Sequence, residues 1–95
     1  MKQEIIDYLL SKGFSQNGDV FTFVMKRPIG EYIINGQRNI RYQDTEIHIK
    51  YIYEGWEGNS EEDSIPITQW SIAVQGETAT EFIIHGLEEF KEMIK

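Results

Sequence analysis

Apolar side chains alternate with polar ones between Thr45 and Glu54, and this two-residue period is the strongest structural signal in the chain. Successive side chains of a strand point to opposite faces of a sheet, so the alternation predicts a strand with one buried face. Three other segments show strand patterning bounded by turn-forming residues and are also predicted as strands. They are Val20–Lys26, Ile67–Gln75 and Thr80–Ile84.

The two ends of the chain have the apolar spacing of amphipathic helices. The first helix is predicted over Gln3–Lys12 and the second over Leu87–Ile94. Gly13 directly follows the first helix, and glycine readily takes the positive φ with which a Schellman motif closes a helix. Leu9 and Phe14 would make the hydrophobic contact of that motif, which agrees with the predicted boundary.

No predicted helix lies between two strands, so the strands are expected to follow one another through hairpins and to run antiparallel. We therefore predict an α+β fold in the order α-β-(ββ)-β-β-β-α. An antiparallel sheet of about four to five strands would be covered by the N-terminal and C-terminal helices. With 95 residues, the chain is expected to form a single domain over residues 1–95.

Residues 27–43 give conflicting signals. Pro28 lacks a backbone N–H and is expected to end the strand that precedes it. Asn35-Gly36 is the strongest short hairpin signal, because both central residues of a type I′ turn need positive φ. The segment is thus interpreted as either a short hairpin or an irregular excursion, with Tyr32 and Tyr42 packed on the sheet.

The sequence lacks the residues of several kinds of chemistry. It contains no cysteine, which excludes a disulfide framework, a thiolate metal site and a cysteine nucleophile. It also lacks a nucleophile elbow, a phosphate-binding loop and a calcium loop. His48 and His85 are interpreted as a solvated strand residue and a residue at the start of the last helix. We therefore expect no catalytic residue, no metal, no cofactor and no enzymatic activity. A small enzyme is a minor alternative, which would need a pocket that brings His48 or His85 together with a carboxylate.

The net charge of -7 is unevenly distributed. Residues 1–50 sum to +1 and residues 51–95 to -8, with five acids within 54–63, in a segment predicted as a loop over Gly55–Ser64. Binding of nucleic acid over the whole surface is not expected, because phosphate contacts need clustered Lys and Arg. The basic and aromatic residues of 26–42 leave single-strand binding as a minor alternative.

Trp56 lies in the predicted loop, where periodicity gives no reason for its burial, and Ile52 breaks the polar row of its strand. We group these two with the neighbouring Tyr53. They are the candidate contact surface, although Trp56 is also interpreted as a lid over the sheet edge. We expect a cytoplasmic, acidic protein-interaction or accessory domain, with a protein partner or a homodimer and no membrane association. The alternative is an acidic nucleic-acid mimic that inhibits a basic protein, since the acids of the second half would steer such an association.

Overall fold

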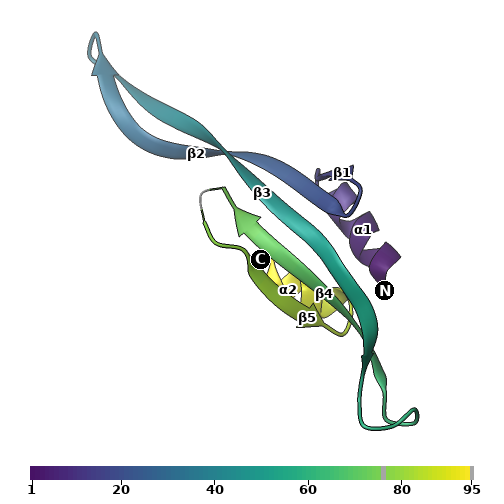
Figure 1. Ribbon diagram of the computed structural model, residues 1–95. Coiled ribbons are helices and arrows are strands. Elements are labelled where there is room, and N and C mark those ends of the chain that lie inside the picture. The colour runs from purple at the N-terminus through teal and green to yellow at the C-terminus, as the bar shows by residue number, and fades with distance from the viewer. Residues whose placement is uncertain (76, 95) are drawn as a thin grey trace.

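The strands form one antiparallel sheet in chain order, with both helices on the same face (Figure 1). In the computed structural model, which describes residues 1–75 and 77–94, this confirms the predicted α+β fold. The elements are α1 (Lys2–Ser11), β1 (Ser15–Asn17), β2 (Val20–Ile34), β3 (Gln37–Glu57), β4 (Ile65–Val74), β5 (Thr80–Ile84) and α2 (Leu87–Met93). Among the described residues, no helix is both long and apolar enough to cross a membrane.

The core lies between the helices and the sheet. Trp70 is fully buried at its centre, and its indole N–H donates to Thr68 Oγ1 at 2.9 Å. The ring of Phe21 from β2 contacts it in a tilted orientation, and the ring of Phe90 from α2 contacts it edge-on. The other members of this cluster are Ile5, Ile6, Leu9, Ile49, Phe82 and Ile84. Every core residue therefore lies outside the segment between Phe21 and Ile49.

The predicted close of the first helix is confirmed. The Phe14 N–H donates to the Leu9 carbonyl and the Gly13 N–H to the Leu10 carbonyl, both at 3.1 Å, while Gly13 has a φ of 94°. These are the two hydrogen bonds of a Schellman motif. Ser15–Asn17, which is not among the predicted strands, forms a short edge strand that pairs with Val20–Thr22.

The expectation that Pro28 ends its strand is wrong, since β2 continues to Ile34. The Glu46 carbonyl accepts a hydrogen bond from the Gln75 N–H, so the backbone groups of Glu46 point away from β2. Backbone groups alternate in direction along a strand, and those of the other even-numbered residues of β3 therefore also point away from β2. Pro28 opposes Tyr42, and its nitrogen therefore points to the free edge, where no ladder hydrogen bond is lost. The register shift between Pro28 and Gly30 makes Ile29 a β-bulge.

Residues 27–43 are a hairpin rather than an irregular excursion. Asn35 and Gly36 have φ angles of 52° and 76°, as a type I′ turn requires, and Ile34 pairs with Gln37 across it. The two strands of this hairpin are continuous with β2 and β3. The molecule is consequently elongated, 70 × 21 × 21 Å, with a radius of gyration of 18.1 Å. A compact chain of this length would have a radius of roughly 12 Å.

Candidate functional site

The outer part of the β2–β3 hairpin projects from the body as a two-stranded arm, which we define as residues 26–44 (Figure 1). On one side, β1 pairs with β2 at Val20–Thr22, which lie before the arm begins. On the other side, the pairing of β4 with β3 begins at Ile47. Among the described residues, both long edges of the arm therefore have no neighbouring strand. Such edges carry backbone N–H and C=O groups that readily pair with another chain.

Large apolar side chains are exposed along the arm. Ile33 is 75% exposed and Tyr42 57%, and Ile40 lies in the same row because residues opposite each other share a face. On the other face, Tyr32 and Ile34 are also exposed. The prediction that Tyr32 and Tyr42 pack on the sheet is therefore wrong. An isolated two-stranded ribbon has no layer to cover either face, so its apolar residues stay in solvent.

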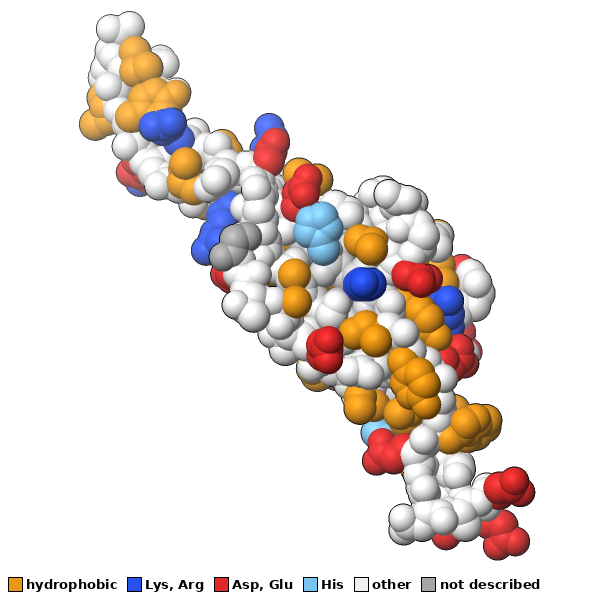
Figure 2. All heavy atoms as spheres, in the orientation of Figure 1, with side chains coloured by type: hydrophobic (Ala, Val, Ile, Leu, Met, Phe, Trp, Pro, Cys, Tyr) orange, Lys and Arg blue, Asp and Glu red, His pale blue; other side chains and the backbone are white. Residues whose placement is uncertain are grey.

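The arm is also basic. It holds four cations and two acids, Glu31 and Asp44. Arg38 donates to Glu31 through Nε at 3.0 Å and through a second guanidinium nitrogen. Lys26, Arg27 and Arg41 form no ion pair with any described residue. Blue and orange side chains accordingly lie together on the arm in Figure 2.

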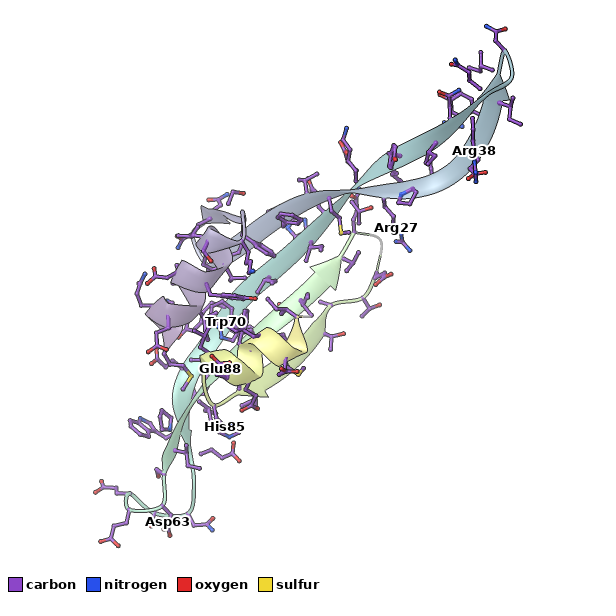
Figure 3. The ribbon with its side chains drawn as sticks, turned by 180° about the vertical axis from the view of Figure 1, so that it is seen from behind. Arg27, Arg38, Asp63, Trp70, His85 and Glu88 are labelled. Atoms are coloured by element: carbon purple, nitrogen blue, oxygen red, sulfur yellow. The ribbon has the colours of Figure 1, made fainter. Side chains whose placement is uncertain are left out.

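The opposite end of the molecule is acidic. β3 continues to Glu57, which pairs with Ile65, so the predicted loop over Gly55–Ser64 is shortened to residues 58–64. We call residues 54–65 the acidic ribbon. Its five acids are Glu54, Glu57, Glu61, Glu62 and Asp63, and it contains no Lys or Arg. Figure 3 shows Arg38 near the arm tip and Asp63 at the far end.

The three sequence-predicted contact residues lie at this acidic end. Ile52 sits at a register shift of β3, and it is 39% exposed. Trp56 is 69% exposed and, with Glu61 and Ser64, lines a surface hollow of about 460 Å³. The interpretation of Trp56 as a lid over the sheet edge is therefore wrong. Tyr53 is half exposed, and its ring lies over Gly55 in a position that a Cβ at residue 55 would occupy.

His85 joins the acidic ribbon to the last helix. Its Nδ1 lies 3.0 Å from Glu89 Oε2, and its Nε2 lies 3.5 Å from Glu57 Oε2. The hydrogen bond with Glu89 raises the pKa of His85 above its usual 6.5, and the negative charges of Glu89 and Glu57 act in the same direction. The same hydrogen bond lowers the pKa of Glu89. His85 thus lies between Glu57 at the base of the ribbon and Glu89 of α2.

His48 lies on the sheet face opposite the helices. Its ring nitrogens lie 3.2 Å from Thr22 Oγ1 and 3.0 Å from Glu46 Oε2, so two neighbouring side chains account for both. Neither of the two surface hollows found among the described residues is lined by a histidine. Within residues 1–75 and 77–94, no group of three or more His, Asp or Glu side chains is placed to hold a metal ion.

Comparisons with protein-family models, with curated proteins and with solved structures gave no match to this chain. Its function is therefore inferred from its own geometry. Sequence reasoning placed the protein-contact surface at the acidic end and considered residues 26–42 only for single-strand nucleic-acid binding. The available signal was the pairing implied by Asn35-Gly36, which aligns the apolar residues on either side of the turn into one ribbon.

Proposed function

We propose that this protein is a non-enzymatic interaction domain whose arm is the surface that contacts another protein. The observation that carries the proposal is the arm itself: a projecting ribbon with free edges and exposed apolar residues on both faces. Soluble monomers rarely expose such continuous apolar surface, and where they do it commonly marks a binding site. An aromatic and a cationic side chain, such as Tyr42 and Arg41, are also the types enriched in protein interfaces.

The body supports this proposal by supplying a rigid base. The core residues Phe21 of β2 and Ile49 of β3 pair with each other and anchor the two strands of the hairpin in the body. A rigid body that presents a ribbon can add strands to a partner through backbone hydrogen bonds, while the alternate side chains provide specificity. Chemistry on a substrate would need reactive groups converging in a cleft, whereas His85 and its carboxylates lie on an exposed surface.

The test is site-specific photo-crosslinking in cells that make the full chain. A photoreactive residue replaces Ile33 or Tyr42 on the arm, and Glu88 on α2 serves as the exposed control position. We expect protein adducts from both arm positions and far fewer from position 88. Adducts to nucleic acid from the arm, or no adducts at all, would refute the proposal. The former result would favour the single-strand binding considered from the sequence.

A further inference from the structure

The two ends of the molecule are complementary in charge and cannot meet within one chain. The arm is basic and apolar, and the acidic ribbon carries five acids and the exposed Trp56. β3 runs from the arm tip at Gln37 to Glu57 in the ribbon, and at about 3.3 Å per residue its length accounts for the whole 70 Å extent. The arm can therefore reach an acidic ribbon only on a second molecule.

The exposed area of the chain is large enough to form an interface. A compact monomer of 11.2 kDa exposes roughly 5,700 Å². This chain exposes 6959 Å², which is about 1,300 Å² more. A standard protein interface buries roughly 800 Å² on each partner. The additional exposed surface of this chain is therefore larger than the area that one partner buries in a standard interface.

We propose that the arm of one chain binds the acidic ribbon of a second copy of this chain, in a closed antiparallel pair. A two-fold axis through the middle of the pair makes the two arm–ribbon contacts equivalent, and such closed symmetric dimers are the commonest oligomers. Two of the arm cations that form no ion pair with a described residue, Arg27 and Arg41, would face Glu61 and Glu62 of the other chain. This inference rests on the proposed function, because it names the protein that the arm contacts.

The experiment exchanges the charges of the two surfaces. In the arm-reversed chain, Arg27→Glu and Arg41→Glu make the arm acidic like the ribbon. In the ribbon-reversed chain, Glu61→Lys and Glu62→Lys place cations at the two ribbon positions that face Arg27 and Arg41. Each variant alone meets like charges at both contacts, whereas a mixed pair has opposite charges at both. Both variants keep a net negative charge, so overall attraction between the chains cannot mimic the expected result.

We expect light scattering to find the wild-type chain as a dimer at high micromolar concentration and each variant as a monomer. An equimolar mixture of the two variants is expected to restore the dimer. As a control, Glu4→Lys with Glu88→Lys makes the same change in net charge as the ribbon reversal, but on the two helices. This control variant should still form the dimer. Circular dichroism verifies that each variant is folded, since none of these residues lies in the core.

A wild-type monomer would overturn the pairing, as would variants that still dimerise alone or a mixture that stays monomeric. Larger open assemblies would also overturn it, because they indicate a head-to-tail contact that does not close. The proposed function fails separately. If the purified chain is monomeric but Ile33 still crosslinks to a different protein in cells, the pairing is wrong and the interaction domain stands.

Discussion

Removal of the arm should leave the body as stable as before. Met25 pairs with Thr45 at the base of the arm, just as Ile34 pairs with Gln37 at its tip. Thr45 and Gln37, the β3 members of the two pairs, are separated by an even number of positions. Hydrogen-bonded and non-hydrogen-bonded pairs alternate along an antiparallel ladder, so both pairs are of the same kind. The Asn-Gly turn can thus replace residues 26–44 directly, joining Met25 to Thr45 through a type I′ turn without changing the register of the remaining strands.

The expected change in the free energy of unfolding follows from what the arm contributes. No core residue is lost, and a two-stranded ribbon is at best marginally stable on its own. The connection between β2 and β3 shortens roughly nine-fold, which by loop-closure entropy is worth up to about 2 kcal/mol. The free energy of unfolding should therefore be unchanged, or higher by at most about 2 kcal/mol.

The assay is urea denaturation followed by far-ultraviolet circular dichroism, at a dilution where the full chain is monomeric. Trp70→Ala serves as a contrast, because removing a fully buried aromatic side chain costs about 3–5 kcal/mol. If deletion of the arm destabilised the body by a similar amount, the arm would be part of the fold, and the account of it as a binding appendage would be refuted.

Three further predictions concern single residues. Gly36→Ala places a Cβ at a φ of 76° and should speed amide exchange in the arm while the melting temperature of the body stays constant. Gly13→Ala, at a φ of 94° and beside the Phe23 ring, should destabilise the whole fold by about 1 kcal/mol or more, lowering the melting temperature by roughly 4–8 °C; an unchanged melting temperature would contradict the Schellman assignment. The His85–Glu89 pair should stabilise the fold fully at pH values above the usual pKa of a glutamate and below the usual histidine pKa of 6.5. Its contribution is lost as pH rises through the raised pKa of His85, and as pH falls through the lowered pKa of Glu89. An NMR titration should show the His85 midpoint falling in Glu89→Gln, and an unchanged midpoint would argue against the pair.

The elements of the body could be predicted because their signals are local. Alternation around Ile49 fixed a strand, and the glycine after Lys12 fixed the end of a helix. At the tip of the arm, Asn35-Gly36 favoured a hairpin without excluding an irregular excursion. Each of these signals depends on the backbone preferences of a few neighbouring residues, which tertiary structure did not override.

The arm could not be predicted because its features depend on register. Pro28 ends a strand only if its nitrogen faces a partner, and the pairing with Tyr42 decides which way it points. Tyr32 and Ile40 look like core residues from their composition alone. They are exposed because the chain supplies no third layer at that distance from the body. Trp56 lies where no periodicity applies, so the sequence could not say whether its ring is covered.

Hydrogen exchange of the arm at two protein concentrations tests the central claim most directly. In dilute solution, the amides on the free edges of residues 26–44 should exchange rapidly, whereas those of β4 stay protected. At high concentration, the account predicts slower exchange in the arm and in the acidic ribbon, with no change in α1 or α2. Equal exchange of the arm at both concentrations would contradict it.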